Sequence, residues 1–165
     1  MPEKKRSAGG GTPATVAATQ AKIKFELHPY EADPGADSYG EAAADALGVP
    51  YEQIFKTLLA EVDGRLTVAV VPVAGRLDLK ALAAAVGGRK AQLADPATAQ
   101  RSTGYVLGGI SPLGQRRRLP TVVDESATVF ATVYVSAGRR GLQIELDPAD
   151  LIALTCATTA EIGRT

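Results

Sequence analysis

The stretch that decides the fold of this chain reads IFKTLLAEV at residues 54–62, DG at 63–64 and RLTVAVVP at 65–72. Two runs rich in apolar and β-branched residues flank an Asp-Gly pair, a strong short-range signal for a β-hairpin. The pattern predicts two antiparallel strands of similar length joined by a two-residue turn. Lys56 is the only lysine of this hairpin and interrupts an otherwise apolar run.

Further strands are predicted on both sides of the hairpin. Residues 23–27 alternate between apolar and charged side chains, and residues 142–146 alternate between apolar and polar ones, which is typical of half-buried strands. Residues 119–123 and 128–136 are rich in β-formers and are also predicted to be strands. The motif AGRRG at 137–141 predicts a tight turn between the last two strands.

Five helix starts are indicated by capping residues followed by apolar runs. They are Thr12-Pro13, Ser38 with Glu41, Asp78, Asp95-Pro96 and Asp147-Pro148. Short turns join most elements, so the sequence predicts one α+β domain at residues 12–165, with a mixed, mainly antiparallel central sheet and surrounding short helices. Residues 1–11 contain AGGG and are predicted to form a flexible N-terminal tail. We expect residues 102–115, with four glycines and a proline, to be a structured loop or a broken strand.

The formal net charge of zero conceals an uneven distribution of charge. Residues 26–63 hold nine acids and one base, Lys56, whereas residues 64–140 hold eleven bases and four acids. Zero net charge argues against indiscriminate binding to nucleic acid. The basic stretch could still make local contacts with phosphates of a nucleic acid.

Several function classes are excluded by composition. The chain has one cysteine and one histidine, so it has no internal disulfide and cannot build a Cys/His zinc cluster. A metal held by carboxylates alone stays open, but no DxDxDG calcium loop is present. Its apolar runs stay below about 18 residues, and the first residues lack the apolar core of a secretory signal. We therefore expect a cytoplasmic protein without a metal, a cofactor or a membrane partner.

The two rarest side chains are interpreted as structural. His28 is expected to end a strand and to be hydrogen-bonded or solvated, since no partner for a catalytic triad stands near it in the sequence. Cys156 lies in an Ala/Thr-rich segment without a neighbouring base and is expected to be a buried thiol rather than a nucleophile.

Two features carry a hypothesis of chemistry. Lys56 either faces solvent or points into a cleft, where a partly buried ammonium can bind a phosphate or an ester oxygen. Gly108-Gly109 is either a tight turn or a loop whose backbone N–H groups stabilise an oxyanion. The loop matches neither dinucleotide-binding nor P-loop motifs.

Two arginine clusters flank glycine-rich turns. Solvated surface charge and phosphate contacts to a nucleic acid both remain open for them. The clusters are Arg116, Arg117 and Arg118, and Arg139 and Arg140.

At these residues the sequence resembles the YbaK/EbsC family, bacterial proteins that deacylate mischarged tRNA. The resemblance extends from Thr12 to Leu151 and is strongest to the branch of Cys-tRNA(Pro) deacylases. Its motifs are HPYEADP at 28–34, FKTLL at 55–59, PVAGRLDLK at 72–80, ADPATAQRSTGYVLGGISPLGQRRRLPT at 94–121 and YVSAGRRGL at 134–142.

The resemblance implies a mixed α+β editing domain and cleavage of the ester between cysteine and the terminal adenosine of tRNA(Pro). The thiol of the substrate is expected to attack its own carbonyl and to form a cyclic thiolactone. Such an intramolecular attack gains about 7–11 kcal/mol from proximity, which agrees with the missing protein nucleophile.

The resemblance also implies a set of site residues. Lys56 matches the essential lysine of the family and is expected to hold the terminal nucleotide near the ester. With Lys56, Gly108 and Gly109 are expected to be catalytic, and the backbone of the loop at 108–112 is expected to line the aminoacyl pocket. The residues expected to bind the substrate are Tyr30, Phe55, Thr57, Ile110, Ser111, Pro112 and Ser136. One position departs from the pattern, because several relatives carry an aspartate where this chain has Gln143.

Alternative functions stay open at this point. A non-catalytic module could bind charged tRNA or its synthetase through the same arginines. A deacylase for Ala-tRNA(Pro) or another small amino acid would require water as the nucleophile, because such a substrate has no thiol. Prolyl-tRNA synthetase is an expected partner on family grounds, since the chain carries no separate tRNA-binding domain.

Overall fold

A computed structural model describes residues 11–32 and 38–165 of the chain. Its helices are α2 (Pro13–Gln20), α3 (Tyr39–Leu47), α4 (Leu79–Ala85), α5 (Pro96–Thr103) and α6 (Pro148–Thr155), with a 3-10 helix η1 (Glu125–Val129). Its strands are β1 (Phe25–Pro29), β2 (Phe55–Val62), β3 (Arg65–Pro72), β4 (Arg76–Leu77), β5 (Ala91–Leu93), β6 (Thr121–Asp124), β7 (Val133–Arg139), β8 (Leu142–Leu146), β9 (Thr158–Ala160) and β10 (Gly163–Arg164). The predicted α+β class is confirmed.

The predicted hairpin forms the longest strand pair of the described chain. Strands β2 and β3 pair antiparallel from Phe55 opposite Pro72 to Val62 opposite Arg65. The turn residues Asp63 and Gly64 both have positive φ, 52° and 84°, as a two-residue hairpin turn requires. The hairpin lies in a five-stranded sheet of order β5-β2-β3-β6-β9, in which β6 runs parallel to both of its neighbours.

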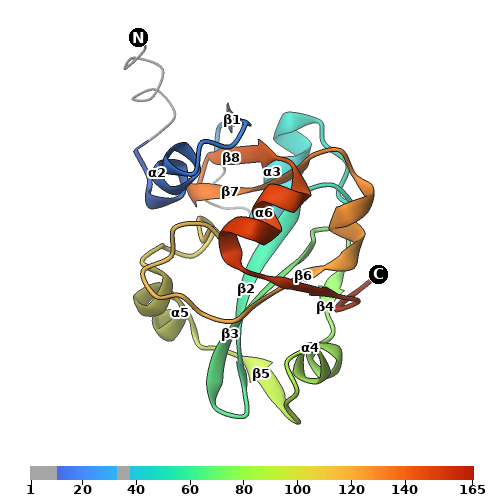
Figure 1. The fold of residues 1–165 in the computed structure, drawn as a ribbon. Coiled ribbons are helices and arrows are strands. Elements are labelled where there is room, and N and C mark those ends of the chain that lie inside the picture. Colours follow the sequence, from blue (N-terminus) through green and yellow to red (C-terminus); the bar gives the residue numbers. More distant parts are fainter. Residues whose placement is uncertain (1–10, 33–37) are drawn as a thin grey trace.

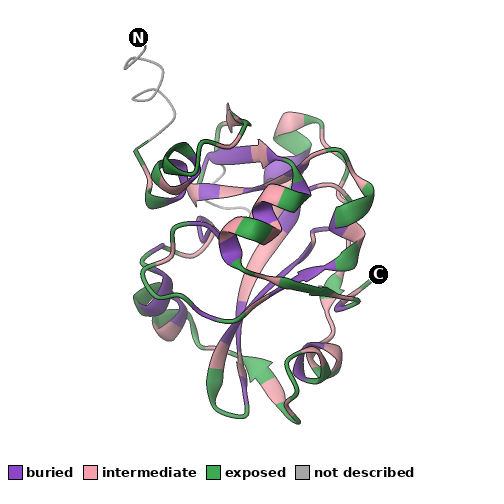
Figure 2. Cartoon of the chain, viewed as in Figure 1, coloured by how far each residue is buried: buried purple, intermediate pink, exposed green. Residues whose placement is uncertain are grey.

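A second sheet of order β1-β8-β7 is antiparallel throughout and lies at the top of Figure 1, whereas the β2–β3 hairpin extends to the bottom. The two sheets meet where Ile54 bridges Tyr134 in parallel orientation. The main core joins one face of β2 and β3 to one face of β7 and β8, together with α2 and α6. Figure 2 shows these strands largely buried and the outer sides of the helices exposed.

Two smaller cores cover the opposite faces. Leu82 and Ala83 of α4 pack against Ala60, Val62 and their neighbours on the five-stranded sheet. Ala43 and Ala44 of α3 pack against Ile54 and Val73, with Tyr30 and Tyr134 at the margin. Helix α3 therefore covers the place where the two sheets join.

The predicted helix starts are confirmed by their caps. The side chain of Thr12 accepts a hydrogen bond from the backbone N–H of Thr15, and the Thr15 side chain accepts one from Thr12 in return. The other four caps each accept a hydrogen bond from the first helical turn. They are Ser38, Asp78, Asp95 and Asp147.

Two strand predictions need correction. The strand predicted at 128–136 is wrong in its first half, because Asp124 accepts hydrogen bonds from Ser126 N–H and Oγ and starts η1 instead. The strand predicted at 23–27 begins and ends two residues later and includes Pro29. Proline is tolerated there because β1 is an edge strand, paired in the described structure with β8 alone.

For residues 102–115 the sequence left a structured loop and a broken strand open. Helix α5 ends at Thr103, and the rest of the segment is a structured loop. The tail predicted at residues 1–11 lies outside the described residues, apart from Gly11. Asp33 and Pro34 of the HPYEADP motif also lie outside them. Among the described helices, none is both long and apolar enough to cross a membrane.

A prediction concerns Asp124, which joins β6 to the segment before β10. Its buried carboxylate accepts hydrogen bonds from the backbone N–H groups of Ile162 and Gly163 at 2.9 and 2.8 Å. Asp124→Ala should lower the free energy of unfolding by about 2–3 kcal/mol, because these buried donors lose a charged acceptor. Urea denaturation measures the change. Replacement of the exposed neighbour in Glu125→Ala should change it by less than about 0.5 kcal/mol, and equal losses would contradict the assignment.

Candidate active site on the polar face of the three-stranded sheet

The face of the β1-β8-β7 sheet that points away from the main core is polar. In β7, Val133, Val135 and Ala137 are buried in the core, so Tyr134 and Ser136 point to the opposite face. The register places Ser136 opposite Gln143 of β8, and Gln143 opposite His28 of β1. Ser136, Gln143 and His28 therefore form one row across this face.

Lys56 belongs to the same face. Two residues paired in a parallel bridge point to the same side, and Ile54 and Tyr134 do so in the cluster that they share with α3. Lys56 follows Ile54 by two residues, and Ser136 follows Tyr134 by two residues. Side chains two residues apart on a strand share a face, and β2 and β7 contact each other, so Lys56 and Ser136 lie on the same face. The structure thus brings together Lys56 and Ser136, two of the predicted site residues, with Gln143 beside them.

The environment of Lys56 is that of a half-buried ammonium rather than a solvated one. Burial lowers the pKa of its side chain below the ordinary value, and the charge of Glu41 in the first turn of α3 raises it in part. Lys56 is therefore not fully solvated, which fits the second of the two alternatives that the sequence left open no worse than the first.

The glycine loop packs against the β7–β8 turn and the start of α3. Gly108 has a φ of +84°, and a Cβ there would lie 2.9 Å from Cγ of Tyr39 and 2.7 Å from Nε of Arg140. A Cβ at Gly109 would lie 2.8 Å from Cα of Arg139. Only residues without a side chain fit such close approaches, so both glycines are required by packing.

Arg140 links these segments to one another. Its Nε donates a hydrogen bond to the carbonyl of Leu107 at 2.8 Å, and its guanidinium lies 4.6 Å above the ring of Tyr39. The guanidinium of Arg140, one of the predicted tRNA contacts, is therefore already bound to other groups of the protein. Arg139 and Arg140 are exposed, as are Arg116, Arg117 and Arg118.

The backbone of the glycine loop offers fewer donors than its sequence indicates. The N–H of Gly109 donates to the carbonyl of Val106 at 3.0 Å and closes a turn. Within the described residues, the N–H groups of Gly108 and Ile110 have no such partner. These two groups are the remaining candidates for contact with an oxyanion.

The rest of the loop is held by internal hydrogen bonds. Ser111 is fully buried, and its Oγ accepts a hydrogen bond from the N–H of Leu113 at 3.1 Å. The buried hydroxyl of Tyr105 donates to the carbonyl of Leu113 at 2.6 Å. Pro112 and Ile110 are buried as well. The side chains of residues 110–112 therefore shape the loop rather than line an open pocket.

Three further predicted site residues have different surroundings. Phe55 is 2% exposed and lies in the main core, and Thr57 follows it on the same side of β2, away from Lys56. Tyr30 is half-buried beside α3, and its backbone N–H donates to the carbonyl of Gly141 at 2.9 Å. Tyr30 therefore borders the polar face, whereas Phe55 and Thr57 point away from it.

Gln143 is a residue for which the structure adds a functional signal. It is 6% exposed, and its Oε1 is buried with no hydrogen-bond partner among the described residues. A buried acceptor without a partner costs about 1–3 kcal/mol. Oγ1 of Thr57 is buried without a partner in the same way, but Gln143 lies on the polar face in the row of Ser136, whereas Thr57 points away from that face.

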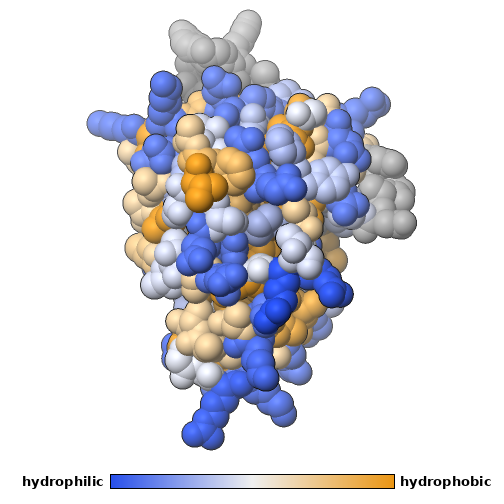
Figure 3. All heavy atoms as spheres, turned by 90° about the vertical axis from the view of Figure 1, so that its right-hand side faces the viewer, coloured by the Kyte–Doolittle hydropathy of each residue, from blue (hydrophilic) through white to orange (hydrophobic). Residues whose placement is uncertain are grey.

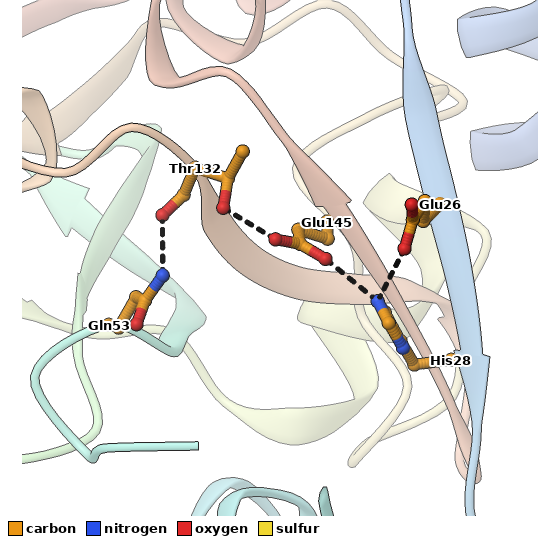
Figure 4. A network of polar contacts seen from close by, with 5 residues as sticks. All are labelled: Glu26, His28, Gln53, Thr132 and Glu145. Atoms are coloured by element: carbon orange, nitrogen blue, oxygen red, sulfur yellow. Dashed lines mark hydrogen bonds and ion pairs between the residues drawn. The ribbon is translucent and has the colours of Figure 1, made fainter.

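A second polar group on this face was not predicted. His28 Nε2 lies 2.9 Å from Glu145 Oε1 and 3.7 Å from Glu26 Oε1 (Figure 4). Burial raises the pKa of the Glu145 carboxyl, but hydrogen bonds from Thr132 and His28 leave it below its usual value. The expectation of a hydrogen-bonded His28 is confirmed. In the sequence, polar residues alternate with apolar ones at 26 and 28 and again at 143 and 145, which indicates a polar face on each strand. Only the register of β1 with β8 shows that the two polar faces lie side by side.

Cys156 contradicts the sequence expectation of a buried thiol. It is exposed at the end of α6 in the left-handed conformation, with φ +55°, and Nη1 of Arg118 lies 2.8 Å from its sulfur. The apolar segment around it predicted burial, but the position that ends a helix turns its side chain outward.

A separate surface groove of about 990 Å³ lies between η1 and the C-terminal residues, with Asp124, Glu161 and Arg164 among its lining. It is on the side of the molecule shown in Figure 3, where hydrophilic side chains predominate with small apolar spots between them. None of the predicted site residues lines this groove.

The polar face with its half-buried lysine belongs to a small α+β domain, and comparison with known proteins gives its family. The family model of the aminoacyl-tRNA editing domain matches residues 33–154. The chain belongs to the aminoacyl-tRNA editing domain family.

Individual relatives agree with this assignment. The chain is 42% identical over 125 residues to EbsC of Enterococcus faecalis, named as a Cys-tRNA(Pro)/Cys-tRNA(Cys) deacylase, covering 74% of this chain and 75% of EbsC. It is 28% identical over 152 residues to the multifunctional Ser/Thr-tRNA deacylase ProXp-y of Escherichia coli K12, covering 89% of each. A crystal structure described as a trans-editing enzyme for prolyl-tRNA synthetase superposes with a TM-score of 0.78 at 26% identity, covering 93% of this chain and 96% of that one.

A prediction concerns the titration of Lys56. Its pKa should lie below the ordinary value of a lysine side chain, because burial disfavours the charged form. Glu41→Gln should lower the pKa of Lys56 further, since the Glu41 charge opposes the effect of burial. NMR detection of the lysine Cε resonances against pH measures both. The matched change Glu31→Gln should leave the pKa of Lys56 unchanged. A Lys56 that titrates at the ordinary value of a free lysine would refute a half-buried ammonium.

Proposed function

We propose that this protein deacylates mischarged aminoacyl-tRNA in trans and that Cys-tRNA(Pro) is its preferred substrate. The observation that carries the proposal is the half-buried Lys56 on the same polar face as Ser136 and Gln143, beside the glycine loop. Membership of the editing-domain family supports the reaction. The name of EbsC, the relative with 42% identity, supports cysteine as the amino acid.

The proposed reaction uses the thiol of the substrate as nucleophile. The sulfur attacks the ester carbonyl, a C–S bond forms, and the C–O bond to the ribose breaks. The thiol proton passes to the departing ribose oxygen and restores its hydroxyl group, so the products are a cyclic thiolactone and intact tRNA. In this proposal Ser136 is not the nucleophile: its Oγ accepts a hydrogen bond from Gly138 N–H. The single histidine, His28, contacts Glu145 rather than Ser136.

The protein then has two tasks, positioning and electrostatic stabilisation. Lys56 holds the terminal nucleotide near the ester, where partial desolvation strengthens its interaction with an anionic or carbonyl oxygen. The N–H groups of Gly108 and Ile110 stabilise the negative charge that develops on the carbonyl oxygen. Tight packing of the loop against Arg139 and Tyr39 keeps these donors fixed before the substrate binds.

Gln143 completes the pocket in this proposal. Its unpaired Oε1 accepts a hydrogen bond from the α-ammonium group of the aminoacyl moiety. Relatives with aspartate at this position would offer a charged acceptor instead. A neutral amide binds an ammonium group less strongly, so this chain relies more on the fit of the side-chain pocket.

A panel of charged tRNAs tests the reaction. Purified protein should release cysteine from Cys-tRNA(Pro) faster than the spontaneous rate and should act weakly on Ala-, Ser- and Thr-tRNA. Rapid clearance of serine or threonine would instead favour the activity named for the E. coli relative. A substrate charged with S-methylcysteine should resist the enzyme, because its sulfur cannot form a thiolactone. Binding without release from any of them would favour a non-catalytic tRNA-binding module.

A mutational prediction follows for the same assay. Lys56→Ala should reduce kcat/KM by about 10²–10³-fold, the scale seen when a preorganised electrostatic group is removed. The exposed-lysine control Lys80→Ala should keep full activity. His28→Ala and Cys156→Ala should keep most of it, since neither side chain is given a role in the reaction. An inactive Cys156→Ala variant would show that the substrate thiol is not the nucleophile.

Gln143→Met separates a binding role from a structural one. Methionine has nearly the same shape but no amide, so KM for Cys-tRNA(Pro) should rise about tenfold while the protein loses no stability, because an unpaired buried carbonyl has been removed. Gln143→Asp should retain activity. Loss of stability with unchanged KM would mean that Gln143 serves the fold alone.

A further inference from the structure

We propose that Glu26, His28 and Glu145 form a binding site for a divalent transition-metal ion, with Zn²⁺ as the probe. The three residues offer one ligand atom each, and these atoms all lie within 4.8 Å of one another. Glu26 and Glu145 stand directly opposite each other in the β1–β8 pair, and His28 follows two residues along on the same face. The group converges on the His28 Nε2 atom in Figure 4.

The distances fit a tetrahedral ion. Zinc binds nitrogen and oxygen ligands at about 2.0–2.2 Å, which places neighbouring ligand atoms roughly 3.3–3.6 Å apart. His28 Nε2 lies 2.9 Å from Glu145 Oε1 and 3.7 Å from Glu26 Oε1, one slightly shorter and one slightly longer than this spacing. Glu26 is 75% exposed and free to adjust. Shifts of a few tenths of an ångström are enough to seat the ion.

The neighbouring side chains hold the ligands in place. The hydroxyl of Thr132 donates to Glu145 Oε2 at 2.5 Å, and the Thr132 carbonyl accepts from Gln53 Nε2 at 2.9 Å. The ring of Tyr134 lies 5.2 Å from the His28 ring, centroid to centroid, and limits its rotation. Contacts of this kind orient ligands and raise metal affinity.

The ligand chemistry selects the class of ion. One imidazole and two carboxylates suit zinc, cobalt and nickel, whereas magnesium and calcium prefer oxygen ligands alone. Two carboxylates also neutralise a divalent charge. Three protein ligands leave a fourth position for water, so the ion is accessible from solvent. An ion bound here would tie the edge strand β1 to β8.

The test uses the full-length untagged chain after removal of metal with a chelator. Titration with Zn²⁺ should show one ion per chain in the micromolar range or tighter, and the melting temperature should rise with added Zn²⁺. Co²⁺ should give the visible absorption of a low-coordinate site, and Mg²⁺ should have no effect. Because binding itself is measured, the outcome does not depend on whether the protein deacylates tRNA.

Variants assign the ligands. His28→Ala and Glu145→Gln should weaken Zn²⁺ binding by at least about 10–100-fold. Glu26→Gln should weaken it as well, and its exposed position makes it the variant least able to disturb folding. Glu161→Gln and Cys156→Ser are the matched controls and should bind as the parent does. Failure to bind stoichiometrically, or binding that survives all three ligand changes, would falsify the site.

Discussion

The parallel bridge between Ile54 and Tyr134 is the interaction on which the rest of the structure depends. It joins the five-stranded sheet to the three-stranded sheet. It also determines which side chains of β2 point to the same side as which side chains of β7. One side of the junction then carries Phe55, Val133 and Val135 into the main core. The other side presents Lys56 and Ser136 together, so a single pairing separates the apolar interior from the chemically useful face.

In the proposed reaction, that face needs no nucleophilic side chain of the protein. Glycines at 108 and 109 let the loop approach the β7–β8 turn and α3 more closely than any other residue would permit. The result is a fixed backbone beside a lysine with a lowered pKa and an amide oxygen without a partner. Rigid dipoles of this kind stabilise developing charge without reorganisation. A domain built in this way suits the proposed substrate, whose own thiol is the nucleophile.

Local patterns predicted most of the fold, and tertiary pairing decided what they missed. The hairpin and the five helix caps follow from contacts between residues close in sequence, and these predictions are confirmed. The strand proposed at 128–136 failed because Asp124 forms short-range hydrogen bonds that its β-rich composition conceals. Lys56 and the glycine loop were visible as site candidates, whereas the Glu26–His28–Glu145 group depends on the register of β1 with β8. The burial of Ser111 and the exposure of Cys156 likewise depend on loop and helix-end geometry.

Strand β1 has a consequence for how this protein behaves at high concentration. It leaves one side of the β1-β8-β7 sheet unpaired within the described structure, and such an edge can recruit a strand from another copy. Pro29 has no N–H to offer an incoming strand, and the charged Glu26 would have to lose water on contact. The proline that violated the expected end of the strand thus protects the protein from edge-to-edge aggregation.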